Sequence, residues 1–224
     1  MIYLDNLFAA VDDYFIEKLV ENDPIFDQIL VNNQKHQLPP HDVSPSQGKF
    51  LYLLAKIKGA KRILEIGTLG GYSTLWFAKA LDHDGKVVSL EFDKKHAEVA
   101  KENLALAGVA DKATILIGAA SDSLEKMVTS PEPAFDLIFI DADKENNSVY
   151  LKYALQLACP GTIIIGDNVV RDGAVIDPNS ADGRVIGVRS FVDDLSDCPT
   201  LTSTAIETVG VKGYDGFTIS IVEK

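Results

Sequence analysis

Oxygen-bearing side chains follow two short apolar runs in this sequence. Asp141 comes directly after the run 137–140, and Asp167 and Asn168 close a second run that begins at residue 162. Runs of this length are typical of strands buried on both faces of a sheet, and the carboxyl ends of such strands line the ligand crevice of open α/β sheets. If the two strands are neighbours, the three side chains converge. Two carboxylates and an amide are hard ligands, so we predict a divalent cation here, with Mg²⁺ the first choice and Mn²⁺ or Ca²⁺ as alternatives.

A glycine-rich segment, Glu65–Ser73, follows another apolar run and reads EIGTLGGYS. Glycines at the end of a first strand let a ligand approach the backbone closely. The spacing of Gly67, Gly70 and Gly71 does not fit the GxGxxG fingerprint of dinucleotide sites. Glu65 at the strand end would also face a pyrophosphate badly, whereas it would suit a ligand that carries an ammonium group.

The next apolar run ends in Glu91, at the position where an acidic side chain accepts hydrogen bonds from a ribose. A ligand with an adenosine but no phosphates fits both segments, and S-adenosylmethionine is the common one. The simplest alternative is that the glycines only form a tight turn. A nicotinamide-dependent oxidoreductase is a second alternative, but it fails on the glycine spacing. A non-catalytic protein that binds an adenosine ligand is the third, and it would need no metal ligands.

Strand-like and helix-like patterns alternate from residue 62 onwards, which predicts a doubly wound, mostly parallel sheet. Strands are expected over 62–66, 86–91, 113–117, 136–140, 162–165, 201–209 and 216–222. Helices are expected over 72–81, 94–107, 121–128 with Ser121 as its cap, 147–159 and 185–195. The last two strands have no helix between them, so they should form an antiparallel hairpin. We therefore predict a Rossmann-like sheet of seven strands with an antiparallel last strand.

The pattern before residue 45 is helical. Periodic apolar residues predict a helix over 4–19, and Asp23 followed by Pro24 predicts the start of a second one. Three prolines between Leu38 and Pro45 exclude regular structure there, and the last of them should begin a third helix.

The chain has 224 residues, a size that fits one α/β domain. We expect a single domain, 1–224, with an N-terminal helical cap and loop (1–44) and a cofactor-binding core (45–224). A net charge of −12 argues against nucleic acid and anionic membranes as partners. Cys159 and Cys198 show no metal or redox spacing, and no run of about eighteen apolar residues occurs. These features predict a cytoplasmic protein that acts on small molecules.

Three stretches together resemble the cation-dependent O-methyltransferases of the catechol and caffeoyl-coenzyme A type. They are Glu65–Thr74, Phe135–Lys144 and Gly166–Val169. The resemblance extends from Pro45 to Phe217, and the block 209–217 is most similar to the bacterial members. It implies a homodimeric enzyme that transfers a methyl group from S-adenosylmethionine to one hydroxyl of a vicinal-diol aromatic molecule.

The resemblance also implies roles for individual residues. Glu91 would hold the ribose hydroxyls, and Ala119 and Ala120 would lie against the adenine. Tyr72 and Ser73 would line the methionine end. Together with Glu65, the residues expected to bind the cofactor are Val43, Gly67, Tyr72, Ser73, Glu91, Ala119, Ala120 and Asp141.

The metal ligands of this family fall on Asp141, Asp167 and Asn168, and its catalytic lysine falls on Lys144. Beside a dication the neutral amine of Lys144 is favoured, so we hypothesise that it is the general base for the acceptor hydroxyl. The alternative for Lys144 is a solvated side chain that neutralises Asp143. The alternative for the metal ligands is helix capping and chance clustering.

Two positions depart from the family. Many relatives have an aromatic residue where this chain has Asn147, and a tryptophan where it has Arg171. No aromatic wall for the acceptor ring is therefore identifiable, and we interpret Arg171 as a residue that would favour an acidic acceptor. Catechols, caffeoyl-coenzyme A and flavonoids all present the required diol. The negative charge of the protein argues weakly against a coenzyme A ester.

Overall fold

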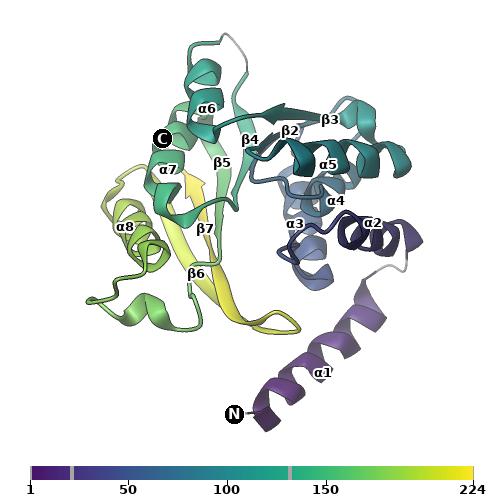
Figure 1. Cartoon of the computed structure of the whole chain (residues 1–224). Helices are drawn as coiled ribbons and strands as arrows, with labels where there is room; N and C mark the ends of the chain where they lie inside the picture. The colour runs from purple at the N-terminus through teal and green to yellow at the C-terminus, as the bar shows by residue number, and fades with distance from the viewer. Residues whose placement is uncertain (1, 21–22, 131–132, 224) are drawn as a thin grey trace. The chain divides into compact units, whose positions relative to one another are not determined.

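The computed structural model describes residues 2–20, 23–130 and 133–223 (Figure 1). Its internal contacts divide it into two compact units. One unit comprises Tyr14–Ser123, and the other comprises Leu124–Lys224 together with Met1–Asp13. Seven strands lie in the described ranges, three in the first unit and four in the second.

The strands of the first unit form a parallel ladder in the order β3-β2-β1. Their bounds are β1 (Arg62–Ile66), β2 (Lys86–Glu91) and β3 (Ala113–Ile117), as predicted. The helices that alternate with them are α4 (Tyr72–Ala80), α5 (Lys94–Leu106) and α6 (Ala120–Val128), with a 3₁₀ turn η1 (Ala110–Lys112) before β3. The predicted cap of α6 was wrong, because that helix begins one residue before Ser121.

The second and third N-terminal helices begin where predicted, at Pro24 and Pro45, whereas the first begins two residues earlier than predicted. α1 covers Ile2–Leu19, α2 covers Pro24–Lys35 and α3 covers Pro45–Lys58. Asp23 accepts a hydrogen bond from the Ile25 backbone nitrogen at 3.1 Å, so it caps α2. The α2 residue Phe26 stacks on Trp76 of α4, with ring centroids 3.9 Å apart, which anchors α2 to the unit.

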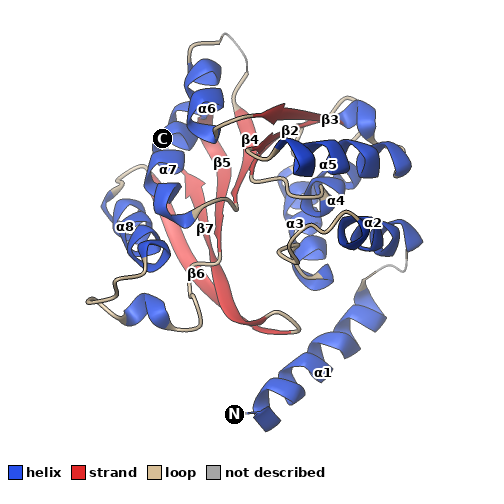
Figure 2. Ribbon diagram, in the orientation of Figure 1, coloured by secondary structure: helices blue, strands red, loops and turns tan. Residues whose placement is uncertain are grey.

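The second unit has a mixed sheet in the order β4-β5-β7-β6, in which β7 runs antiparallel to both of its neighbours (Figure 2). The strand bounds are β4 (Phe135–Ile140), β5 (Ala158–Asp167), β6 (Leu201–Gly210) and β7 (Gly213–Val222). The helical segments are η2 (Lys144–Asn146), α7 (Asn147–Leu157), η3 (Ala174–Ile176) and α8 (Gly183–Asp197). Helices α7 and α8 pack against each other, and α7 also contacts β4 and β5.

The boundary between α7 and β5 differs from the prediction. The helix ends at Leu157 and the strand begins at Ala158, so Cys159 lies in a strand rather than a helix. Ala158 pairs with Phe135, and the ladder then shifts register before it resumes farther along β5. Thr162 stabilises this irregularity, because its Oγ1 donates to the Phe135 carbonyl oxygen at 2.6 Å. The proline and glycine in this segment obscure the strand pattern in the sequence.

The C-terminal hairpin is longer than predicted. We expected a connection over 210–215, but β6 continues to Gly210 and β7 begins at Gly213, and these two residues pair. Gly213 has φ +90°, which suits glycine in a tight turn. Asp215 therefore lies within β7, where it can reach the loop after β5. No helix of the described ranges is both long and apolar enough to span a membrane.

Candidate functional site

The glycine segment forms the turn between β1 and α4. Gly67 and Gly71 adopt φ +101° and +81°, and Leu69 has φ +49°, so the turn runs through the left-handed region. A Cβ on Gly71 would lie 3.2 Å from the Cβ of Ala100 on α5, which leaves little room for a larger residue. The glycines therefore form a tight turn after the first strand, and its contact with a ligand stays a prediction.

Glu65 lies behind this turn and has no exposed surface. Its carboxylate accepts hydrogen bonds from Ser73 and Ser89 at 2.6 Å each, and one from Thr74. The sequence interpretation placed this carboxylate against a ligand ammonium group. The structure instead surrounds it with hydroxyl groups of the protein, so Glu65 connects β1 to the start of α4 and to β2.

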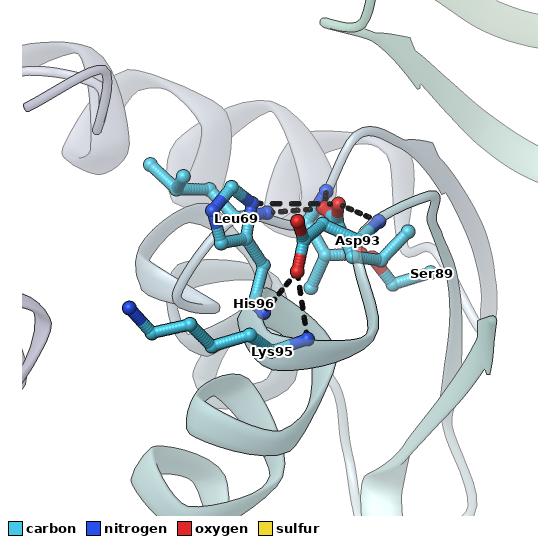
Figure 3. Close-up of polar contacts among 7 residues, drawn as sticks. Leu69, Ser89, Asp93, Lys95 and His96 are labelled. Atoms are coloured by element: carbon cyan, nitrogen blue, oxygen red, sulfur yellow. Dashed lines mark hydrogen bonds and ion pairs between the residues drawn. The ribbon is translucent and has the colours of Figure 1, made fainter. Parts of the chain in front are cut away.

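Glu91 ends β2 and is 8% exposed. Its Oε2 accepts from the backbone nitrogens of Thr68 at 3.1 Å and Leu69 at 2.8 Å, and its Oε1 accepts from that of Asp93 at 2.8 Å. The imidazole Nδ1 of His96 lies 3.6 Å from Oε1. Figure 3 shows Leu69, Asp93 and His96 gathered at this end of the strand. The carboxylate predicted to bind the ribose is therefore held in place from the loops that follow both β1 and β2.

The remaining cofactor candidates of this unit lie in less polar surroundings. Tyr72 is 2% exposed and packs edge-on against Phe26, and burial raises its pKa to about 12, so its ring belongs to the core. Val43 is buried immediately before α3, whereas Ala119 and Ala120 are half-buried where the chain leaves β3 and enters α6. Their assignment to the cofactor stays a prediction.

The metal-ligand candidates belong to neighbouring strands, as the sequence required. Asp141 follows β4 and Asp167 ends β5, and the two strands pair in parallel with Ile140 opposite Gly166. Asp141 directly follows Ile140 and Asp167 directly follows Gly166, so the two carboxylates lie at the same edge of the sheet. Asn168 follows in the left-handed region with φ +52°, and its backbone nitrogen donates to Asp167 at 2.8 Å.

The three side chains offer two carboxylates and an amide oxygen, a donor set that fits Mg²⁺, Mn²⁺ or Ca²⁺. The described residues contain no group of three or more His, Cys, Asp or Glu side chains that could hold a metal. Only Asp141 and Asp167 of the predicted trio are of those types, because Asn168 supplies an amide. Their role as metal ligands stays a prediction.

Lys144 is buried and pairs with Asp141. The amine is 2.8 Å from Oδ1 of Asp141, and the lysine is 6% exposed. The alternative of a solvated lysine that neutralises Asp143 was therefore wrong. The Asp143 carboxylate instead accepts from the Tyr150 hydroxyl at 2.5 Å and from the side chain of Asn146. Burial and the adjacent Asp143 carboxylate raise the pKa of Tyr150, so its hydroxyl stays a donor at neutral pH.

Helix α8 closely approaches both parts of this site. A Cβ on Gly187 would overlap the carbonyl oxygen of Lys144 and lie 2.7 Å from the Cα of Glu145. One turn farther along the helix, the ring of Phe191 covers Gly166, where a Cβ would lie 2.5 Å from the ring edge. The helix thus holds the Lys144 turn and the end of β5. Sequence reasoning missed Gly187, because nothing local distinguishes it from any helical glycine.

The loop after Asn168 is held by Asp215 of β7. Its Oδ1 accepts from the backbone nitrogens of Val170 at 3.0 Å and Arg171 at 3.1 Å. Arg171 adopts φ +57°, a conformation that these hydrogen bonds support. Sequence reasoning assigned Asp215 to a turn and missed this contact, although its place between two glycines marked an irregular segment.

Asn147, the first residue of α7, has no exposed surface. Neither its amide nitrogen nor its oxygen has a hydrogen-bond partner in the described part of the chain.

Solved structures share this fold. An O-methyltransferase from Bacillus cereus in complex with SAH matches with a TM-score of 0.96 and 49% identity over 97% of this chain and 99% of its own. An O-methyltransferase from Streptomyces achromogenes in complex with SAM matches with a TM-score of 0.95 and 42% identity over 98% and 99% of the two chains. The predicted fold is confirmed: a Rossmann-like, mostly parallel sheet with an antiparallel last strand, the fold of class I methyltransferases.

Sequence comparison identifies the family. Residues 16–220 match the O-methyltransferase family. A catechol O-methyltransferase from Mycobacterium tuberculosis is 45% identical over 212 residues, which are 95% of this chain and 94% of that protein. The chain therefore belongs to the O-methyltransferase family, and the catechol and caffeoyl-coenzyme A type that its motifs resemble is confirmed.

Proposed function

We propose that this protein transfers the methyl group of S-adenosylmethionine to one hydroxyl of a vicinal diol on a small aromatic molecule, with a divalent cation held by Asp141, Asp167 and Asn168. The observation that carries the proposal is the edge formed by β4 and β5. Two carboxylates end adjacent parallel strands there, and a buried lysine contacts one of them. If these carboxylates only capped helices or formed surface ion pairs, they would not need to lie side by side at two strand ends. The lysine would also not need to be buried.

The cofactor side of the proposal rests on the first unit. The β1–α4 turn is shaped by glycines, and the Glu91 carboxylate is fixed at the end of β2, where it would accept hydrogen bonds from the ribose hydroxyls. Glu65, Tyr72 and Ser73 would act by shaping the turn. The complexes of the two relatives with SAH and SAM support the same ligand for this chain.

The reaction needs an anionic acceptor oxygen in line with the methyl group. A bound dication would supply the positive charge that favours a deprotonated diol. Asp141, Asp167 and Asn168 would orient it, which contributes the positional part of catalysis. The oxygen–carbon bond then forms as the carbon–sulfur bond breaks, and S-adenosylhomocysteine leaves.

Lys144 would accept the proton of the acceptor hydroxyl. Its amine is held beside Asp141 by the 2.8 Å contact, away from bulk water. From this position the Lys144 amine would reach a hydroxyl of an acceptor bound at the same strand edge. The Asp143–Tyr150 hydrogen bond holds the turn on which Lys144 lies.

We further propose that the protein is a homodimer. Apolar side chains are exposed on α1 and beside the turn of the β6–β7 hairpin, and the two segments meet where the Val211 backbone nitrogen donates to Asp12 at 3.1 Å. The exposed residues at this surface are Leu7, Phe8, Val11, Val209, Val211 and Tyr214. A second copy of the chain would remove them from water.

A methylation assay tests the proposed reaction. The protein is incubated with S-adenosylmethionine, Mg²⁺ and a panel of aromatic vicinal diols, each paired with the matching monohydroxyl compound. We expect monomethylated product from diols only, and loss of turnover with a chelator that is restored by excess Mg²⁺. Turnover that survives the chelator would show that the reaction needs no divalent cation. Equal turnover of the monohydroxyl compounds would show that the enzyme does not recognise the diol.

A further inference from the structure

A ladder of asparagine side chains joins three segments of the first unit. Asn32 and Asn33 lie on α2, and Asn103 lies on α5. Asn33 is 3% exposed and Asn103 is fully buried. Amides are rarely buried to this extent unless a defined set of partners satisfies them, so their partners indicate what they hold.

Both polar atoms of the Asn103 side-chain amide form hydrogen bonds. Its Nδ2 donates to the Gly70 carbonyl oxygen and to Oδ1 of Asn33, both at 2.8 Å, and its Oδ1 accepts from Asn32 at 2.8 Å. Asn33 in turn donates to Oδ1 of Asp42 at 3.0 Å. Gly70 belongs to the β1–α4 turn, and Asp42 precedes Val43, so the ladder connects two segments predicted to contact the cofactor.

The fit between Asn33 and Gly70 is also steric. A Cβ added to Gly70 would overlap the side-chain amide of Asn33. Gly70 has no positive φ, so its backbone conformation would itself accept alanine. Glycine is needed at this position because Asn33 fills the space beside it. Asn103 holds Gly70 by a hydrogen bond instead, because its Nδ2 donates to the Gly70 carbonyl oxygen.

The anchoring of α2 does not depend on this ladder. Phe26 stacks on Trp76, and Lys79 pairs with Asp23 at 2.7 Å, so the helix has separate contacts to α4. Asn33 and Asn103 are therefore not required merely to attach α2. Their shared target is the turn at Gly70.

We propose that Asn33 and Asn103 are positioning residues for the cofactor: they hold the Gly70 turn in the conformation that binds S-adenosylmethionine and tie it to the segment around Val43. This rests on the proposed function, because it assumes that the glycine turn binds that ligand. Neither residue need touch the ligand.

The first test measures the Kd for S-adenosylmethionine by calorimetry on the full-length Asn103→Ala variant. Removing the amide leaves the Gly70 carbonyl without its donor, and we expect the Kd to rise about tenfold. The kcat at saturating S-adenosylmethionine should stay within about twofold of the wild type, because the acceptor-activating residues are untouched. A Kd equal to that of the wild type would overturn the proposal.

The second test uses size complementation, which remains decisive if Asn103→Ala does not fold. Gly70→Ala should weaken binding at least about tenfold, as expected when packing is forced to shift. Asn33→Ala alone should weaken binding less than Gly70→Ala does, because Asn103 still donates to the Gly70 carbonyl oxygen. Adding Asn33→Ala to Gly70→Ala removes the overlapping atoms, so the double variant should bind as well as Asn33→Ala alone. A double variant no better than Gly70→Ala would contradict the steric part of the proposal.

Two control variants separate positioning from general destabilisation. Gly85→Ala introduces a milder overlap, 2.7 Å from the Cβ of Leu81, just before β2 rather than at the glycine turn. It should lower the melting temperature and leave the Kd unchanged. Gln34→Ala, on an exposed position of α2, should change neither.

If the wild type binds NAD but not S-adenosylmethionine, the proposed function fails and this proposal with it. If the wild type binds S-adenosylmethionine and all variants bind equally, only this proposal fails.

Discussion

At the scale of single residues, the partner of Lys144 decides what that side chain can do. Asp141 and Asp143 are both close to it in sequence, and either could have neutralised it on the surface. The structure pairs the amine with Asp141 and assigns Asp143 to Tyr150 and Asn146. A buried amine beside a proposed metal ligand is placed for proton transfer, whereas a solvated one beside Asp143 would not be.

Lys144→Ala should therefore reduce kcat by about 10²–10⁴-fold, the usual contribution of a positioned acid–base group. The Kd for S-adenosylmethionine should change little, because Lys144 is not among the residues predicted to bind the cofactor. Initial rates with a diol acceptor at several pH values provide the measurement. Lys152→Ala, an exposed lysine on α7, serves as the control. Wild-type turnover of Lys144→Ala at every pH would refute the general-base assignment.

At the scale of elements, α8 positions the turn that carries Lys144, the proposed general base. Gly187 lies against the backbone of Lys144 and Glu145, and Phe191 covers Gly166 beside the proposed ligand Asp167. Two close contacts from one helix therefore determine where the ends of β4 and β5 lie with respect to it. Such contacts tolerate little added volume, because the atoms that must move are backbone or ring atoms.

Gly187→Ala should displace the Lys144 turn and lower kcat at least about tenfold, since misplacement by an ångström can cost about a hundredfold. Gly183→Ala is the matched control in the same helix, because its Cβ would meet only the flexible side chain of Glu145, at 3.3 Å. We expect it to keep both kcat and the melting temperature. Steady-state kinetics and thermal melts of the two variants provide the comparison. Equal kcat in both would show that α8 does not position the turn.

At the scale of the whole molecule, the exposed apolar residues of α1 and the hairpin predict a second copy of the chain. Phe8→Asp should convert a dimer to a monomer in light scattering after size exclusion, because it places a charge in a surface that association would bury. Ile57→Asp, at an 80% exposed position of α3, should leave the dimer intact. A wild-type mass of 24.3 kDa across the concentration range would contradict the proposal.

The strands, the caps and the residues at strand ends could all be predicted because their signals are local. An apolar run, an aspartate before a proline, or a carboxylate that follows a strand depends only on neighbours in the chain. The order of the motifs was sufficient to indicate the family, which the comparisons confirmed. Where glycine or proline interrupts the pattern, as in β5 and the hairpin, the predicted bounds were wrong.

The sequence by itself determined which residue types lie at the proposed site and that they follow two strands. These residues are Asp141, Asp167, Asn168 and Lys144. Tertiary structure alone decided that Lys144 pairs with Asp141, and that Glu65 is surrounded by hydroxyl groups behind the glycine turn. It also decided that Gly187 of α8 lies against the backbone of Lys144 and Glu145. The physical reason is that the burial of a side chain and its ion-pair or hydrogen-bond partners depend on residues distant in the chain. No local pattern encodes which of two nearby carboxylates a lysine will contact once the sheet and α8 exclude water.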